Sequence, residues 1–545
     1  MVDAVAPLRI PRFRALWLAA IFSNLGSFLQ AVAASWLMLE LTGSATWVGL
    51  MAASATLPLL FLALAAGAVA DMFDRRWVLV AAQSTMGLAA TLMALLTWMD
   101  VVTPAILLAL GLLLGVGLAF NLPSWQATVP DLVPRGMVAS AVALNSVAFN
   151  VARAVGPALG GLIIVVSGAQ TAFAINAFSY LGIILVLIAL ARSMPTPDRP
   201  ETSMRNAIGV GIRFARFTKP FRRVLILAAL FALTSAVVQA VLPNRTEQLG
   251  GDAGTFGILL GAMGFGALVG GLSREPVTSR LGRLSLPLTV ALFGVSGIGL
   301  GLASSTAAAA SALFVAGMAW VWTLANLNAT AQLMSPEWVR GRAMGLYTLA
   351  FVGILPVGSI IAGALADRIG ADGAEIVLSV GAVVLGLVIA PLLGIPALDD
   401  VETPEFTEDR DTIRHVETEG GPVLVMNTWH VNDGNLSEFF EVMNEVRLVR
   451  LRTGAYRWRL YRDTEDPHSL TEVFLTVSWN EHLAQHERID DAAATTIRRA
   501  RSLDRGEGPS TTHLVAVDID ADADWESLVT SHARFHSADG SIPIE

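Results

Sequence analysis

The chain has 545 residues, of which 54% are hydrophobic and only 15% charged, whereas a typical soluble domain has about 25% charged residues. It contains no cysteine, which excludes disulfides, thiolate metal ligands and cysteine nucleophiles. Its first 400 residues consist largely of uncharged apolar runs, each long enough to cross the hydrocarbon core of a bilayer as a helix. These features exclude a soluble globular protein and predict one that crosses a membrane many times.

Charge divides the chain into two parts. Residues 1–400 contain 22 Lys and Arg against 17 Asp and Glu, a net charge of +5, whereas residues 401–545 contain 14 against 28, a net charge of −14. All eight histidines also lie in the second part. This shift predicts a membrane part followed by an acidic linker (396–420), a folded domain (421–518) and an acidic tail (519–545).

We predict twelve transmembrane helices in the first part. Alternate loops differ strongly in Arg and Lys content, and the poorer side contains only Arg245 and Arg368. Because positively charged loops stay in the cytoplasm, both termini and the folded domain are predicted to be cytoplasmic, in a multi-pass protein of the inner membrane. The predicted spans are 15–39, 47–70, 77–98, 103–126, 138–165, 170–191, 222–243, 254–273, 286–304, 307–331, 343–366 and 375–395.

The two sets of six spans resemble each other. The segment 126–131 at the end of the fourth span corresponds to 332–337 at the end of the tenth, since both begin with Gln and end in Pro followed by an acid. We therefore predict two six-helix halves (9–191 and 222–395), joined by a basic cytoplasmic loop (192–221). This is the layout of a transporter with its substrate site at the bilayer midplane between the halves. The alternative is chance similarity between two apolar sequences.

The loop after the second span resembles the signature G-x-x-x-D-x-x-x-R-[RK] of the major facilitator superfamily. Gly67 would let two helices approach closely, and Asp71 would pair with a loop Arg or with the N-terminus of the eleventh span. Asp74, Arg75 and Arg76 complete this candidate latch, which would break when the cytoplasmic side opens. The alternative is an ordinary positively charged loop with an Asp at a helix end.

No Asp or Glu is expected deep within any span, which leaves few candidates for proton coupling. Glu40 lies near the outer end of the first span, and it and Asp71 are the acids that could supply this role. A second copy of the loop signature runs from Gly363 through Asp367 to Arg368. Span counting places this copy on the outer side, so we assign it no function.

The fifth predicted span contains Gly156, Pro157, Gly160 and Gly161, and resembles the span-5 signature of facilitator exporters. Small residues permit close helix packing and Pro157 kinks the helix, so this span is expected to close against the glycine-rich eighth span. The signature favours export over import, and the alternative is generic packing of small residues.

Arg153 lies within the same span, with no other charge as far as Arg192. An intramembrane charge is costly, so Arg153 is predicted to face the cavity and bind an anionic group, or else to extend to the cytoplasmic interface. Polar residues inside the spans either line the substrate cavity or form interhelical hydrogen bonds. The cavity candidates, which Trp320 and Trp322 accompany, are Asn24, Gln30, Trp36, Asn121, Trp125, Gln126, Asn150, Gln239, Asn326, Asn328 and Gln332.

The segment 421–518 predicts strands and helices in the order βαββαβ, an α+β ferredoxin-like domain. Its two helices are expected at 436–451 and 480–500, the second capped by Asn480. The domain resembles the dimeric barrel of the antibiotic-biosynthesis monooxygenases, which implies self-association.

His482 and His486 have the i, i+4 spacing of a metal site. Leu483, however, occupies the position where the zincin motif has Glu. We therefore expect a solvated or interface helix face, and predict neither a metal nor a cofactor. Because the domain has no nucleophile and no clear acid–base pair, a regulatory, sensing or self-associating role is favoured over catalysis.

The whole chain resembles the enterobactin-exporter branch of the major facilitator superfamily. The residues that carry this resemblance are 24–26, 36–43, 67–76 and 153–161. It implies a secondary active transporter, not an enzyme, that exports a siderophore, hydrophobic metabolite or drug by alternating access, with a small molecule and the bilayer as partners and no nucleic acid. The alternatives are an importer of a metabolite or lipid, and a transporter fused to a domain that oxidises its cargo.

Overall fold

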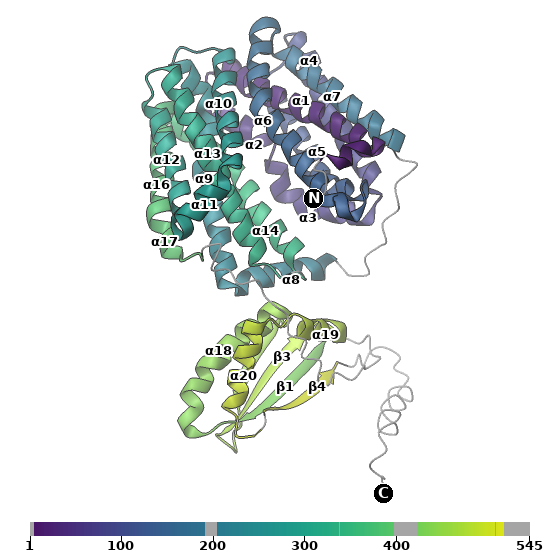
Figure 1. Cartoon of the computed structure of the whole chain (residues 1–545), viewed down its shortest axis with the longest axis vertical. Coiled ribbons are helices and arrows are strands. Elements are labelled where there is room, and N and C mark those ends of the chain that lie inside the picture. The colour runs from purple at the N-terminus through teal and green to yellow at the C-terminus, as the bar shows by residue number, and fades with distance from the viewer. Residues whose placement is uncertain (1–4, 191–203, 337, 397–421, 507, 517–545) are drawn as a thin grey trace. The chain divides into compact units, whose positions relative to one another are not determined.

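Twelve helical segments long and apolar enough to cross a membrane dominate the computed structural model (Figure 1). It describes residues 5–190, 204–336, 338–396, 422–506 and 508–516. The chain divides into two units, one with all twelve candidate spans and one with a C-terminal α+β domain. The predicted fold class, a polytopic helical membrane protein with twelve spans and an α+β domain, is thereby confirmed.

The first half contains six candidate spans. Its helices are α1 (Pro11–Thr42), α2 (Ala45–Ser54), α3 (Leu57–Met72), α4 (Arg75–Trp98), α5 (Pro104–Asp131), α6 (Val138–Ser167) and α7 (Ala169–Leu190). The second span is broken between α2 and α3, because Pro58 in the first turn of α3 has no N–H with which to continue a helix. Gly43 ends α1 in the left-handed conformation, with φ 61°, which turns the chain directly into α2.

The second half repeats this plan. Its helices are α9 (Lys219–Gln248), α10 (Ala253–Leu272), α11 (Arg274–Leu281), α12 (Ser285–Leu302), α13 (Thr306–Leu333), α14 (Arg340–Val352), α15 (Leu355–Ile369), α16 (Ala371–Val384) and α17 (Ala390–Leu393), with a π-helical turn, η5 (Leu385–Ile389), before α17. Part of the predicted loop 192–221 is helical, since α8 (Met204–Phe217) lies within it and α9 begins at Lys219.

The helical bundle has two ends, which we name after residues in their turns. The Ser44 end contains the turn between α1 and α2, and the Asp74 end contains the turn between α3 and α4. The two halves pack most tightly from mid-bundle to the Ser44 end. There a Cβ on Gly49 would overlap the carbonyl oxygen of Ser359, and a Cβ on Gly363 would overlap that of Ala45, so α2 and α15 are in backbone contact.

The second close contact between the halves joins α6 and α10. A Cβ on Gly161 would overlap the carbonyl oxygen of Ala253, and a Cβ on Gly257 would lie 2.5 Å from the carbonyl oxygen of Pro157. The structure thus brings together the fifth and eighth spans, whose small residues allow the two backbones to touch.

The C-terminal domain is one antiparallel sheet with helices on one face (Figure 1). Its elements are β1 (Val423–His430), α18 (Leu436–Thr453), β2 (Arg457–Arg462), β3 (Ser469–Thr476), α19 (Trp479–Glu487), α20 (Asp491–Ser502) and β4 (Ser510–Val515). The strand order is β2-β3-β1-β4. Alternate residues of β1 are buried, and Trp429 packs with Phe439 and Met443 of α18 to form the core.

Two details of this domain differ from the prediction. The expected helix 480–500 is broken into α19 and α20, because the carboxylate of Asp490 accepts the amide hydrogen of Ala493 and starts a new helix. Ser478, not Asn480, caps α19, with its hydroxyl accepting the amide hydrogen of Glu481 at 3.2 Å. The predicted linker, except for Pro396, and the predicted acidic tail lie outside the described residues.

Candidate substrate site between the two halves

Arg153 lies at mid-helix in the interface between the halves. It follows the start of α6 at Val138 by about four turns and so lies near the middle of that helix. Its guanidinium carbon lies 5.8 Å from the ring centroid of Trp320, which is near the middle of α13 in the other half. A cation over an aromatic face at this distance is attracted to it. The interpretation that Arg153 faces a partner in the bundle is therefore favoured over the interfacial one.

Trp320 belongs to an aromatic cluster that we define as Phe231, Phe293, Trp320 and Phe351. The ring centroid of Trp320 lies 5.6 Å from that of Phe231 and 5.7 Å from those of Phe293 and Phe351. The four rings come from α9, α12, α13 and α14, and all are buried. Because aromatic rings packed on each other have little rotational freedom, the cluster is a rigid platform beneath Arg153.

Hydrogen-bond donors outnumber acceptors at this site. The indole N–H of Trp320 is buried without a hydrogen-bond partner, and no carboxylate of the described residues forms an ion pair with Arg153. A guanidinium has five N–H donors and no acceptor. The site therefore suits a ligand that combines an aromatic ring with acidic or carbonyl oxygens.

Two of the predicted cavity residues instead cross-link helices within the first half. The side-chain oxygen of Gln30 accepts a hydrogen bond of 2.5 Å from the Asn176 amide, which joins α1 to α7. Asn121 accepts one of 2.9 Å from the Gln83 amide, which joins α5 to α4. For Gln30 and Asn121, the alternative of interhelical hydrogen bonding describes what is seen.

The other polar and aromatic candidates do not gather at one point. Trp36 stacks on Phe256 of α10 at 5.9 Å and donates a hydrogen bond of 2.6 Å to Glu40, which is exposed near the end of α1. Trp322 donates to the carbonyl oxygen of Gly270 at 2.8 Å. The candidates with half-buried or exposed side chains are Asn24, Trp125, Gln126, Asn150, Gln239, Asn328 and Gln332.

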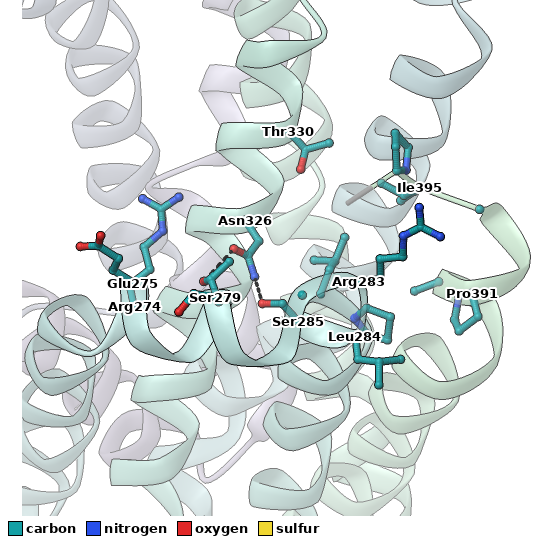
Figure 2. Close-up of a pocket in the computed structure, with 17 residues that line it drawn as sticks. Arg274, Glu275, Ser279, Arg283, Leu284, Ser285, Asn326, Thr330, Pro391 and Ile395 are labelled. Carbon is teal, nitrogen blue, oxygen red and sulfur yellow. Dashed lines mark hydrogen bonds between the residues drawn. The ribbon is translucent and has the colours of Figure 1, made fainter. Parts of the chain in front are cut away.

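A cavity of about 560 Å³ lies at the Asp74 end of the second half (Figure 2). It is lined by α11, the start of α12, α13 and the residues around α17. Asn326 lies in it and donates a hydrogen bond of 2.8 Å to the Ser285 hydroxyl, with Arg274 and Glu275 nearby (Figure 2). This cavity does not include Arg153, so it is separate from the site between the halves.

The candidate latch at the Asp74 end is described only in part. Asp74 caps α4 by accepting the amide hydrogen of Arg76 at 3.0 Å, and Arg75 is the first residue of that helix. The side chain of Asp71 lies outside the described residues. Among the described atoms, a Cβ on Gly67 would meet none within 4 Å, so the described part of the structure shows no close helix approach at Gly67.

The second copy of the loop signature, to which we assigned no function, joins the two halves. The carboxylate of Asp367, in the last turn of α15, accepts hydrogen bonds from the backbone amides of Ala45 and Thr46 at 2.7 and 3.0 Å. It also accepts one from the Ser44 hydroxyl at 2.8 Å. Asp367 therefore caps the N-terminus of α2 from the opposite half. The motif that contains Asp367 could be recognised in the sequence. The sequence did not show that Asp367 would cap α2.

Two buried charges at the Ser44 end were not predicted from the sequence. Arg245, which we placed in an outer loop, lies in α9 and donates to the carbonyl oxygens of Leu300 and Gly301 at 3.2 and 3.0 Å. Glu375 in α16 is fully buried, although it lies near the start of the last span and not deep within it. The position of Glu375 directly before the last apolar run was the sequence feature that could have indicated its burial.

The twelve candidate spans and their packing define a polytopic helical membrane transporter. The chain belongs to the transmembrane secretion effector family of the major facilitator superfamily, which it matches over residues 2–521. It is therefore a secondary active transporter that works by alternating access, and a multi-pass protein of the inner membrane. The family match extends through the C-terminal α+β domain.

Three relatives share about a quarter of their residues with this chain. The staphyloferrin A transporter of Staphylococcus aureus is 25% identical over 64% of this chain and 87% of its own length. The multidrug efflux pump Tap of Mycolicibacterium fortuitum is 27% identical over 71% and 97%, and the enterobactin exporter of Citrobacter koseri is 26% identical over 70% and 92%. Among solved structures, an inward-facing bacterial homologue of ferroportin has a TM-score of 0.58 at 15% identity, over 70% of this chain and 98% of its own.

Proposed function

We propose that this protein exports a small molecule with aromatic and acidic groups, such as a siderophore, a hydrophobic metabolite or a drug, from the cytoplasm. The observation that carries the proposal is the guanidinium of Arg153 above the buried ring of Trp320, at mid-helix between the halves. Three relatives named as siderophore transporters, exporters or drug pumps support this cargo class. Arg153 would bind the acidic group, and the aromatic cluster would support the rings.

The Asp74 end would face the cytoplasm, and both termini with it. Arg75, Arg274 and Arg340 all lie at this end, and positively charged loops stay in the cytoplasm. With the halves packed tightly at the Ser44 end, this structure would be a conformation closed to the outside. Asp71 and the loop around Asp74 would then act as the latch on the cytoplasmic side.

Comparative metabolite profiling of cells and medium tests the direction and the cargo. Deletion of the gene should make one compound accumulate in the cells and disappear from the medium, in iron-poor or iron-rich growth. Accumulation in the medium instead would establish the importer alternative. Complementation with Arg153→Ala should fail and with Arg153→Lys should restore transport partly, while the exposed Arg368→Ala serves as the matched control. Normal transport by both Arg153 variants would refute the anion site.

The C-terminal domain would be a self-associating or regulatory module rather than an enzyme. The face of the sheet opposite its helices carries Leu424, Met426, Val473 and Leu475, which pair across β1 and β3 and are only half-buried. A second copy of this face would cover them. Light scattering of the full-length protein should show a dimer that Met426→Arg dissociates. Substrate-dependent oxygen consumption by the full-length protein would establish the enzymatic alternative instead.

A further inference from the structure

The cavity at the Asp74 end of the second half is not part of the candidate substrate site. Every residue that lines it lies between Arg274 and Pro396, whereas Arg153 lies between the two halves. Its volume of about 560 Å³ is within the range of about 300–1,000 Å³ that is typical of sites for small molecules. The cavity is therefore large enough to bind a ligand of its own.

Basic side chains surround this cavity. Arg274 and Arg283 line it from opposite sides (Figure 2). Arg223 of α9 reaches its edge, where the guanidinium donates a hydrogen bond of 3.3 Å to the carbonyl oxygen of Gly394, another residue of the lining. Glu275 is the acid of the described lining, and its carboxylate points away from Arg283 (Figure 2). The positive charge of the cavity favours an anionic ligand that guanidinium groups can bind, such as a phosphate group.

Fixed polar groups lie between the two arginines of the lining. Asn326 is 2% exposed and donates a hydrogen bond of 2.8 Å to the Ser285 hydroxyl (Figure 2). A hydroxyl that accepts a hydrogen bond keeps its own O–H to donate. Arg274 is itself held by a hydrogen bond of 3.3 Å to the carbonyl oxygen of Ala325. The polar wall is therefore ordered before any ligand binds, which lowers the entropic cost of binding.

Exposed apolar side chains adjoin the polar part of the cavity. Leu284 lines the cavity and is 60% exposed, and Leu392 of α17, which directly follows the lining residue Pro391, is 80% exposed. Leu387 and Val388, one turn earlier in the last span, are exposed as well. Exposed apolar side chains of a spanning helix lie against the acyl chains of the bilayer. A basic cavity thus borders a lipid-facing surface, which matches the charged head and apolar tails of a phospholipid.

We propose that this cavity binds the headgroup of an anionic phospholipid, with Arg274 and Arg283 on its phosphate and its acyl chains along α12 and α17. Basic pockets between membrane helices bind such headgroups by charge attraction. The bound lipid joins α11 to the end of α17 and stabilises the folded second half. The Asp74 end is cytoplasmic in the proposed function, so the lipid comes from the cytoplasmic leaflet. The choice of leaflet rests on that proposed function, and the site itself does not.

Thermal unfolding of the full-length protein in a neutral detergent tests the class of ligand. Phosphatidylglycerol should raise the unfolding midpoint at lower concentrations than phosphatidylethanolamine, because a ligand that binds the folded state stabilises it. Equal protection by these two lipids overturns the proposal. Glycerophosphoglycerol, which is the same headgroup without acyl chains, and inorganic phosphate should not protect at the concentrations at which phosphatidylglycerol does. Protection by either one at those concentrations would assign the cavity to a free phosphate group and overturn the assignment to lipid.

Two variants of the lining test the position of the site. Arg274→Ala and Arg283→Ala should each weaken the apparent affinity for phosphatidylglycerol about fivefold, which is the contribution of one Arg near a membrane surface. Arg14→Ala is the matched control, since Arg14 is exposed at the same end of the first half, and it should leave the affinity unchanged. If Arg274→Ala does not fold, Arg283→Ala decides, because Arg283 is exposed. Wild-type affinity in Arg283→Ala overturns the proposal, as does an equal loss in Arg14→Ala.

Fluorescence quenching in liposomes tests where the acyl chains lie. The protein has no cysteine, so Leu392→Cys provides a single site for a fluorophore beside the cavity. Phosphatidylglycerol with brominated chains should quench this fluorophore more than brominated phosphatidylethanolamine at the same mole fraction. Leu185→Cys, at an exposed position of α7 in the first half, should be quenched equally by both lipids. Equal quenching at Leu392→Cys overturns the proposal. None of these measurements requires a cargo, so failure of the proposed export function would leave their results unchanged.

Discussion

Asp367 accepts a hydrogen bond of 2.7 Å from the backbone amide of Ala45, so that a carboxylate in one half of the bundle caps a helix in the other. The first turn of a helix has amide hydrogens without partners and a partial positive charge. The carboxylate of Asp367 accepts hydrogen bonds from these amides and its negative charge is attracted to the helix end. The contact occurs at the Ser44 end, where the glycines of α2 and α15 bring the backbones together. Opening this end requires these hydrogen bonds to break.

Asp367→Ala should therefore favour the conformation that is open at the Ser44 end. Loss of a helix cap costs about 1 kcal/mol, which is a factor of about five in an equilibrium. The protein has no cysteine, so Ser359→Cys, at the contact between α2 and α15, provides a single labelling site. Asp367→Ala should increase its labelling by a membrane-impermeant maleimide about fivefold, whereas Arg368→Ala should not. Equal labelling would show that the cap does not control opening.

Gly161→Ala should weaken the contact between α6 and α10. The added Cβ would overlap the carbonyl oxygen of Ala253, and backbone cannot move aside cheaply. Such overpacking costs about 1–3 kcal/mol. The thermal unfolding midpoint in detergent should fall, and labelling at the Ser44 end should rise. Gly271→Ala, also in the glycine-rich eighth span, is the matched control, since a Cβ there meets no atom within 4 Å. Equal effects of both variants would contradict this reading.

Glu472→Ala should unfold the C-terminal domain locally. Glu472 is 0% exposed and accepts hydrogen bonds from Asn427, Arg450 and Trp458 at 2.7, 3.1 and 2.9 Å. Removing one partner of a buried ion pair leaves a buried charge and costs about 3–5 kcal/mol. Hydrogen exchange of β1 and β3 in the full-length protein should accelerate accordingly. Glu438→Ala, which breaks an exposed ion pair, should change it little. Equal acceleration of exchange in Glu472→Ala and Glu438→Ala would show that burial does not determine the contribution of an ion pair to the stability of this domain.

Acid should destabilise the same domain through His482. Burial lowers its pKa to about 3, with further contributions from the nearby positive charge of His486, His513 and Arg450, whereas the ordinary value is 6.5. Between these pH values the unfolded state binds a proton that the folded state does not. The free energy of unfolding should therefore fall by up to about 1.4 kcal/mol per pH unit below about 6. Hydrogen exchange should report this acid sensitivity, which His482→Gln reduces and the exposed His430→Gln retains. A part should remain, because burial also lowers the pKa of His513. Undiminished acid sensitivity in His482→Gln would show that His482 is not its source.

The sequence alone was sufficient to predict the membrane spans, the unusual residues within them and the α+β domain. Apolar runs of about twenty residues can only be spanning helices, so the twelve spans follow from composition and length. The small residues around Gly161 and the intramembrane Arg153 also stand out locally, because glycine and charge are each unusual for an identifiable physical reason. The alternation of strands and helices after residue 421 likewise predicted the α+β domain.

The tertiary structure decided which of these residues meet. Gln30 and Asn121 are polar residues of the kind that line a cavity. Their side chains instead form hydrogen bonds with Asn176 and Gln83 within the first half. Span counting placed Asp367 on the outer side, where the sequence suggested no function for it. In the structure, Asp367 caps α2, a helix of the opposite half. The hydrogen-bond partners lie 38 residues apart for Asn121, 146 for Gln30 and 322 for Asp367. The local pattern of a sequence does not show which of these distant residues come together. Only packing shows that Arg153 faces Trp320 and that Glu375 is buried without a partner.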